Sequence, residues 1–209
     1  MNKRNYQKEL DVLIDGFKAG ERVPTLLLHS CCAPCSSYVL KYLSEWFRIT
    51  VLYFNPNISP KEEYLKRVEE QKRLINAMPV INPVEFIEGR YNPAEFYELV
   101  KGLENEPEGG RRCFACYEYR LNEAASYAQR YGFDYFTTTL SISPLKNADK
   151  INEIGEKVGV KYGVKHLPSD FKKKDGYKQS VELSKEYNLY RQNFCGCIFS
   201  KREDKENDF

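Results

Sequence analysis

Cysteines are the residues of this sequence most able to do chemistry, and they fall into three short groups. The first takes three of five consecutive positions, the second is a C-x-x-C pair and the third a C-x-C pair: Cys31, Cys32 and Cys35; Cys113 and Cys116; Cys195 and Cys197. Seven is an odd number, so a closed set of disulfides cannot use all of them. Clustered thiols in a reducing compartment bind metal or do redox work more often than they brace a fold.

Several kinds of site use thiols at such spacings: a thioredoxin-like dithiol, a zinc site and an iron–sulfur cluster. A structural zinc site takes four ligands, commonly with histidine, and this chain has only His29 and His166. We interpret His29 as a buried, hydrogen-bonded side chain. Seven thiols exceed one zinc site and suit a four-ligand cluster with a separate redox pair or second metal. The number of thiols therefore favours an iron–sulfur cluster. The alternative for any single cysteine is that it serves as a small hydrophobic residue of the core.

The first cysteine group follows directly on an apolar run at 25–29. Adjacent side chains on a strand point to opposite faces, so Cys31 and Cys32 can reach one centre only from a loop. A strand, a tight loop and a helix start form the arrangement by which α/β proteins present chemistry at the carboxyl edge of a sheet. We expect the other cysteine groups to converge there. The loop lacks the serine and glycine run of pyrophosphate-binding loops, so ATP use is not expected.

Alternating strands and helices must position these groups. The apolar and β-branched runs predict strands at 25–29, 49–54, 84–87, 135–139 and 164–167. Helical spacing predicts helices at 6–20, 36–46, 60–76, 93 onward, 113–131, 149–158 and 177–187, with Ser59 and Asn92 opening capping boxes. This pattern predicts an α/β fold, with a mostly parallel sheet of about five strands and helices on both faces.

Length and composition fit one catalytic domain over residues 1–209. Within it we expect an N-terminal helix in 1–20, a C-terminal segment at 170–200 that carries the last cysteine pair, and a flexible tail at 201–209. Net charge is only +2, so bulk charge neither demands nor excludes a nucleic-acid partner. No run of about 18 apolar residues and no secretion signal is found, so we expect a cytoplasmic protein without a membrane partner.

Local charge offers an RNA-binding hypothesis. Basic and aromatic residues stand beside the second and third cysteine groups and in the segment between them: Arg111, Arg112, Lys172, Lys173, Lys174, Tyr177 and Arg191. Such residues neutralise phosphates and stack bases, although charge runs are usually solvated faces. Asp170 opens the segment that leads to the last cysteines. We consider Asp170 as a hypothetical acid or metal ligand. The simpler interpretation is that its side chain caps a helix.

Five motifs together resemble the QueH-type epoxyqueuosine reductases, in order, from about residue 26 to residue 200. They are HSCCAPC at 29–35, FNPNI at 54–58, RCFACYEYRL at 112–121, FTTTLSISP at 136–144 and YRQNFCGC at 190–197. The resemblance implies a Rossmann-like fold related to nucleotide-hydrolase domains. It also implies the last step of queuosine synthesis, in which the epoxide of epoxyqueuosine at the tRNA wobble position is reduced to the alkene.

By position, the resemblance implies that Cys31, Cys32, Cys113 and Cys116 hold a [4Fe-4S] cluster. Cys195 and Cys197 would be a redox-active pair or ligands to a second, mononuclear iron, and Cys35 has no implied role. The partners are tRNA that contains epoxyqueuosine and an electron donor that the sequence does not identify. A thiol–disulfide oxidoreductase and a non-catalytic zinc-binding module are the alternatives from other classes.

Overall fold

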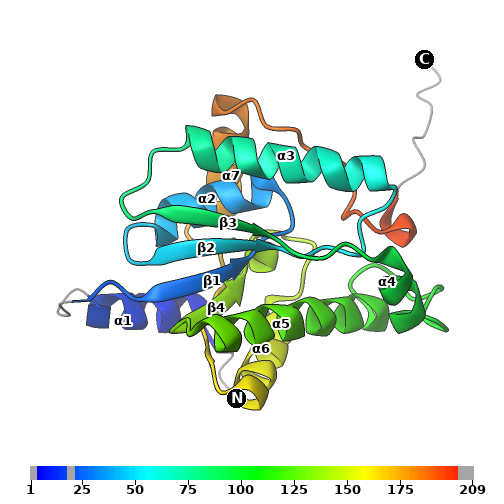
Figure 1. Cartoon of the computed structure of the whole chain (residues 1–209), viewed down its shortest axis with the longest axis horizontal. Helices are drawn as coiled ribbons and strands as arrows, with labels where there is room; N and C mark the ends of the chain where they lie inside the picture. The colour runs from blue at the N-terminus through cyan, green and yellow to red at the C-terminus, as the bar shows by residue number, and fades with distance from the viewer. Residues whose placement is uncertain (1–3, 18–21, 202–209) are drawn as a thin grey trace.

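Five parallel strands lie at the centre of the computed structural model (Figure 1), which describes residues 4–17 and 22–201. In the order in which they pair, the strands are β3 (Val84–Glu88), β2 (Arg48–Tyr53), β1 (Thr25–His29), β4 (Tyr135–Thr138) and β5 (Lys165–His166). The central strand β1 is apolar from Leu26 to Leu28 and is buried on both faces there, because helices cover the sheet on each side. The predicted α/β class is confirmed.

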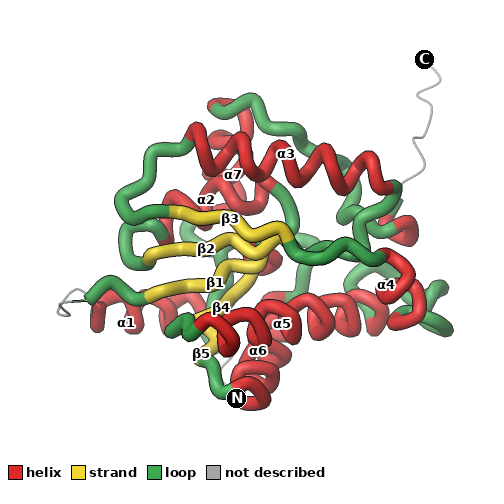
Figure 2. The backbone as a smooth tube through the Cα atoms, in the orientation of Figure 1, coloured by secondary structure: helices red, strands yellow, loops and turns green. Residues whose placement is uncertain are grey.

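Helices cover both faces of this sheet (Figure 2). They are α1 (Tyr6–Phe17), α2 (Ala33–Leu43), α3 (Lys61–Ala77), α4 (Pro93–Leu99), α5 (Arg111–Tyr131), α6 (Ala148–Tyr162) and α7 (Gly176–Glu186), with 3-10 turns at Thr139–Ile142 and Ile198–Ser200. In Figure 1, α2, α3 and α7 lie on one side of the sheet, and α5 and α6 lie on the other. None of the helices in residues 4–17 and 22–201 combines the length and hydropathy that a bilayer crossing requires.

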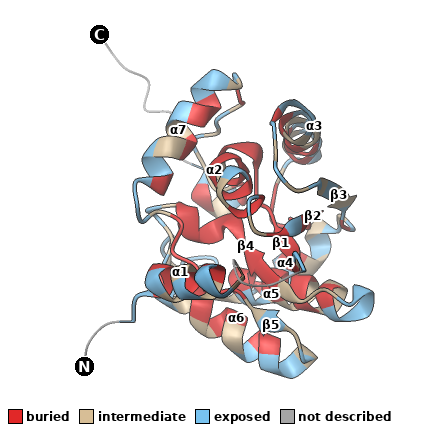
Figure 3. Cartoon of the chain, turned by 90° about the vertical axis from the view of Figure 1, so that its left-hand side faces the viewer, coloured by how far each residue is buried: buried red, intermediate tan, exposed pale blue. Residues whose placement is uncertain are grey.

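Alternation of side chains along β1 divides the core into two parts. Leu26 and Leu28 pack with Leu40 of α2 on one face, whereas Leu27 packs with Leu121 of α5 and Ile151 of α6 on the other. Buried residues accordingly concentrate where the helices face the sheet (Figure 3). The two cores fix the helix starts of α2 and α5 against the carboxyl edge of the strands.

The start of α2 and the capping of α3 differ from the sequence prediction. Helix α2 begins at Ala33 and not at Ser36, because Pro34 in its first turn is compatible with helical backbone. Cys35 therefore lies on a helix and not in the loop. The predicted capping box at Ser59 is wrong: Pro60 is the N-cap residue of α3, no side chain caps the helix, and the Ser59 amide instead donates to the carbonyl oxygen of Gly196 at 3.0 Å.

The ends of the chain were predicted as a helix in 1–20 and a tail at 201–209. Helix α1 occupies Tyr6–Phe17, with Leu10 and Ile14 buried against the sheet. Residues 1–3, 18–21 and 202–209 lie outside the described residues, and the remaining parts of both predictions fall there.

His166 of β5 gives the fold a test that depends on pH. Both ring nitrogens are buried and have no hydrogen-bond partner among the described residues, and the ring lies edge-on to Phe136. Burial lowers the pKa of His166 to about 3. Folding therefore favours the neutral ring, and the free energy of unfolding should fall as the pH drops from about 6.5 toward 3.

His166→Phe keeps a flat ring against Phe136 but removes the titration. From the shifted pKa, we expect the loss of unfolding free energy between pH 7 and pH 5 to be smaller in the variant by about 2 kcal/mol. Urea unfolding at both pH values measures this difference. An equal pH dependence in both proteins would show that His166 is not held neutral by the fold.

Candidate active site at the carboxyl edge of the sheet

The first cysteine group forms a compact triad. Cys31 and Cys32 lie in the loop after β1, Cys35 lies in the first turn of α2, and the three sulfur atoms lie within 4.8 Å of one another. The Sγ atoms of Cys31 and Cys32 are 3.9 Å apart. Two thiolates bound tetrahedrally to one ion at about 2.3 Å would lie about 3.8 Å apart, so the spacing suits ligands of a single metal ion.

Buried polar groups hold this loop in place. His29 contacts the Thr138 hydroxyl with Nδ1, at 2.8 Å, and the Phe54 carbonyl oxygen with Nε2, at 3.1 Å. Burial lowers the pKa of His29 to about 3, which agrees with its interpretation as a buried, hydrogen-bonded residue. Behind the triad, the Ser30 hydroxyl donates to the side-chain oxygen of Gln71 at 2.8 Å. The loop is thereby tied to β2, β4 and α3.

The other four cysteines line one narrow cavity. Cys113 and Cys116 lie in the first two turns of α5, and Cys195 and Cys197 lie in the loop before the last 3-10 turn. The amide of Gly109 donates to the sulfur of Cys113 at 3.2 Å. All seven cysteines are free thiols. Two segments whose nearest cysteines, Cys116 and Cys195, are 79 residues apart in the chain therefore meet at the start of α5.

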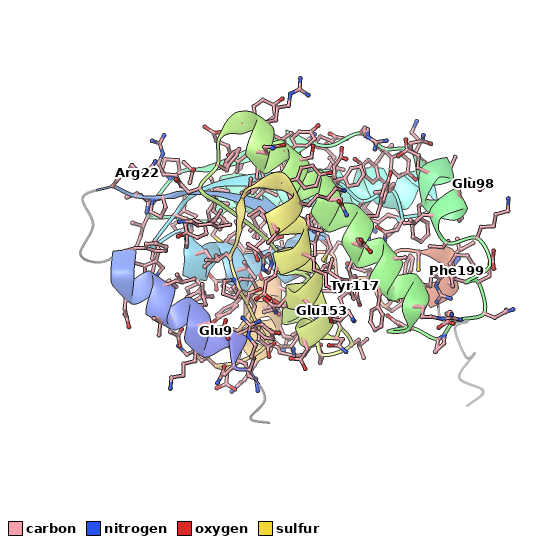
Figure 4. All side chains as sticks on the ribbon, turned by 90° about the horizontal axis from the view of Figure 1, so that it is seen from below. Glu9, Arg22, Glu98, Tyr117, Glu153 and Phe199 are labelled. Atoms are coloured by element: carbon pink, nitrogen blue, oxygen red, sulfur yellow. The ribbon has the colours of Figure 1, made fainter. Side chains whose placement is uncertain are left out.

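Helix α3 positions the loop that carries the last pair. The guanidinium group of Arg67, only 1% exposed, donates to the Cys195 carbonyl oxygen at 3.1 Å and pairs with Glu63 at 2.6 Å. Gly196 has φ +123°, and a Cβ there would lie 2.9 Å from Ile58 and 3.1 Å from Arg67. Only glycine fits this backbone and this close approach. At the far side of the loop, Phe199 lies beside the start of α5 (Figure 4), with its ring 4.7 Å from the guanidinium of Arg112.

The triad and the four-cysteine cavity adjoin each other. Cys195, Lys146 and Glu108 line the narrow cavity and also a larger cavity, of about 370 Å³, whose wall includes Cys31, Cys32 and Cys35. Other residues of the larger cavity come from the segment before α6, from α7 and from the C-terminal loop: Ser143, Pro144, Leu145, Tyr177, Ser180, Arg191, Gln192, Asn193 and Phe194. The two cavities together therefore form one thiol-rich region that is open on one side.

Positive charge faces these thiols. Arg120 is 1% exposed and donates to the Cys116 carbonyl and the Asn55 side-chain oxygen, at 3.2 and 3.4 Å. Within the described residues, no carboxylate forms an ion pair with Arg120 or Lys146. Burial alone would lower the pKa of both side chains. The neighbouring cysteines outweigh burial and raise both pKa values. The largest such contribution comes from Cys116 for Arg120 and from Cys195 for Lys146.

Within the triad, the pKa of Cys31 is lowered well below its ordinary value. The causes are its side-chain hydrogen bonds with Cys32 and Cys35 and the positive charge of Lys146. The hydrogen bond with Cys31 raises the pKa of Cys32 to about 12. An anionic sulfur surrounded by donors is the form in which cysteine binds metal and attacks electrophiles.

The structure distributes the residues of the RNA-binding hypothesis unevenly. Tyr177 and Arg191 line the larger cavity, and Lys172 and Lys173 line a neighbouring surface cavity that shares Pro144 to Lys146 with it. Arg111 is exposed and pairs with Glu106, and Lys174 pairs with Asp11.

The surroundings of Arg112 differ from those that RNA binding requires. The surroundings of Asp170 differ from those that an acid or metal ligand at the cysteines requires. Arg112 is 2% exposed, and its guanidinium donates to the carbonyl oxygens of Leu103, Glu104 and Glu106. It holds the loop before α5 and is withdrawn from solvent. Asp170 pairs with Lys172 and lines the surface cavity, not either of the cavities that the cysteines line.

Two residues of the site had no role in the sequence analysis: Arg120 appeared only inside a motif, and Lys146 was not singled out. Cys35 was among the candidate metal ligands but had no place in the cluster that the resemblance implies. The spacing of Cys35 from Cys32, which matches one helical turn, is the signal that pointed to it. Lys146 carries no local signal, because only the adjacency of β1 and β4 brings its segment to the cysteines.

Comparison with known proteins shows the family of the chain. The family model described as "Epoxyqueuosine reductase QueH" matches residues 26–203. Curated relatives of the same name include one from Staphylococcus epidermidis, 46% identical over 95% of this chain and 85% of that protein, and one from Streptococcus pyogenes serotype M1, 44% identical over 96% and 79%. A third, from Thermotoga maritima, is 38% identical over 87% of this chain and 93% of the relative. The chain therefore belongs to the epoxyqueuosine reductase QueH family.

Proposed function

We propose that this protein reduces the epoxide of epoxyqueuosine to the alkene at the wobble position of tRNA. The observation that carries the proposal is the meeting of seven thiols from three parts of the chain beside an open cavity. That cavity, of about 370 Å³, falls within the range of small-molecule sites. Family membership supplies the substrate class, and the cysteines supply the means of reduction.

An iron–sulfur centre fits the residues that are present. Thiolates are the usual ligands of such clusters, and the amide that donates to the Cys113 sulfur is of the kind that tunes them. Arg120 and Lys146 offer positive charge, and neither forms an ion pair with a carboxylate of the described residues, which suits an anionic thiolate–iron centre. When bound, the centre would supply single electrons to the substrate.

Two divisions of the cysteines are consistent with that proposal. Family resemblance assigns Cys31, Cys32, Cys113 and Cys116 to a [4Fe-4S] cluster, with the last pair redox-active or bound to a second iron. The geometry also supports a second division, in which the triad of Cys31, Cys32 and Cys35 holds a single iron and the four cysteines of the narrow cavity hold the cluster. Cys35 is a ligand only in the second division.

The protein's own residues bind and orient the substrate. An extruded base that enters the larger cavity would meet the rings of Tyr177 and Phe194 and the side-chain amide of Gln192, whose oxygen is buried and without a partner among the described residues. Aromatic rings stack on bases, and Arg191 at the same cavity can pair with a phosphate. Lys172 and Lys173, next to this cavity, extend the surface that we assign to the anticodon arm.

The test is turnover of tRNA that contains epoxyqueuosine, under anaerobic conditions with dithionite as reductant. We expect the product nucleoside to carry the cyclopentene, detected by mass spectrometry after digestion. The same tRNA treated with dithionite alone is the control. A protein that holds iron but leaves the epoxide intact would refute the proposal, and reduction of protein disulfides in its place would indicate the oxidoreductase alternative.

A further inference from the structure

Lys146 holds an unusual position among the lysines near the site. It lines the four-cysteine cavity, the larger cavity and the neighbouring surface cavity. Within the described part of the chain, its ammonium group has no hydrogen-bond acceptor and no ion-pair partner. By contrast, Lys150 pairs with Glu153 at 2.6 Å, and Lys172 pairs with Asp170.

The backbone around Lys146 is fixed. Its amide donates to the Ser143 carbonyl oxygen at 3.2 Å, and the next residue, Asn147, caps α6 by accepting from the Lys150 amide at 3.0 Å. Ala148 is buried at the start of the same helix. The fixed backbone limits where the half-buried side chain can place its ammonium group, and two of the three cavities that it lines are also lined by cysteines.

The charge on this side chain is well supported by its surroundings. Lys146 is only half-buried, and it lines both of the cavities that the cysteines line. A lysine that is not fully withdrawn from solvent keeps its ordinary charge, so the residue is a cation at neutral pH. A fixed cation with free donor capacity, facing a reaction in which an oxygen gains negative charge, is the arrangement that stabilises such a charge most strongly.

We propose that Lys146 is a catalytic residue whose ammonium group donates a hydrogen bond to the epoxide oxygen and stabilises it as the carbon–oxygen bonds break. The reaction breaks both carbon–oxygen bonds, forms a carbon–carbon double bond and releases the oxygen as water. Two electrons come from the external reductant and two protons from solvent, so Lys146 itself is unchanged. This role rests on the proposed function, because it requires the epoxide to enter the larger cavity beside the triad.

Lys146→Met tests the role by removing the charge while keeping a flexible chain of similar length. We expect kcat to fall by about 10²- to 10³-fold, the cost of losing one preorganised donor. Iron content, the spectrum of the reduced protein and the dissociation constant for tRNA should stay at wild-type values. Lys146→Arg, which keeps a charged donor, should recover part of the lost kcat. Lys157→Met, which removes an exposed lysine of α6 that pairs with Glu153, is the matched control.

Each other outcome overturns the role. A raised KM or weaker tRNA binding with unchanged kcat would make Lys146 a phosphate-binding residue. Loss of iron from Lys146→Met would make it a counter-ion of the metal centre. Wild-type kcat in the variant would show that the ammonium does not reach the epoxide. Failure of the wild-type protein to reduce the epoxide would refute the proposed function itself, and this role with it.

Discussion

Cys113→Ser is expected to leave less than about 1% of wild-type turnover and to lower the iron content of each chain. Cys113 is a ligand in both divisions of the cysteines, and serine keeps its shape without offering a thiolate. Loss of an outer partner of a metal ligand already costs about 10- to 100-fold, so loss of the ligand itself should cost more. Iron and labile sulfide analysis after anaerobic purification, with turnover measured on the same sample, tests this expectation.

Cys35→Ser is the matched comparison, because it makes the same chemical change at a cysteine whose role differs between the divisions. If resemblance gives the ligands correctly, this variant keeps its iron. If the triad holds a single iron, the variant loses about one iron per chain and retains the cluster. Full iron content and full turnover in Cys113→Ser would refute both divisions together.

Arg120→Met should affect the stability of the metal-loaded protein differently from that of the metal-free protein. Arg120 lies on α5, buried, and its raised pKa comes from the sulfurs of Cys116, Cys195 and Cys31. When the sulfurs are anionic ligands, removal of this charge leaves them uncompensated, at a cost of about 3–5 kcal/mol. When the sulfurs are neutral thiols, Arg120 is itself the uncompensated charge. We therefore expect loading with iron to raise the unfolding temperature of wild type much more than that of the variant.

Arg130→Met is the control for this measurement. Arg130 lies in the last turn of the same helix and is exposed, and its charge faces the ring of Tyr131 and not the cysteines. Its removal should leave the effect of iron unchanged. An equal gain of stability on loading in wild type and Arg120→Met would mean that Arg120 does not balance the charge of the cysteine centre.

The sheet was predictable because its signals are local. Residues 26–28 are consecutive leucines, and strands β2 to β4 begin and end within one residue of their predicted limits. Gly132, predicted to end α5, takes φ +70° as its C-cap. The capping box at Ser59 failed for a non-local reason, since the Ser59 amide is engaged by Gly196, 137 residues later in the chain.

The site was predictable in its residue types and less so in its grouping. Cysteine spacing indicated three groups and their meeting at the edge of the sheet. The grouping of the sulfurs depends on where α2 starts. Because the helix begins before Pro34, Cys35 lies in its first turn, beside Cys31 and Cys32. Arg112 shows the converse: it stands beside Cys113 in a basic run, yet three carbonyl oxygens hold it inside the protein.

Mössbauer spectroscopy of the protein purified without oxygen from cells grown on ⁵⁷Fe tests the central claim most directly. If thiols from the three cysteine groups form one iron–sulfur centre, the spectrum will show a [4Fe-4S] cluster, with about four or more iron atoms in each chain. Colourless protein with one equivalent of zinc, or with seven titratable thiols and no metal, would contradict it.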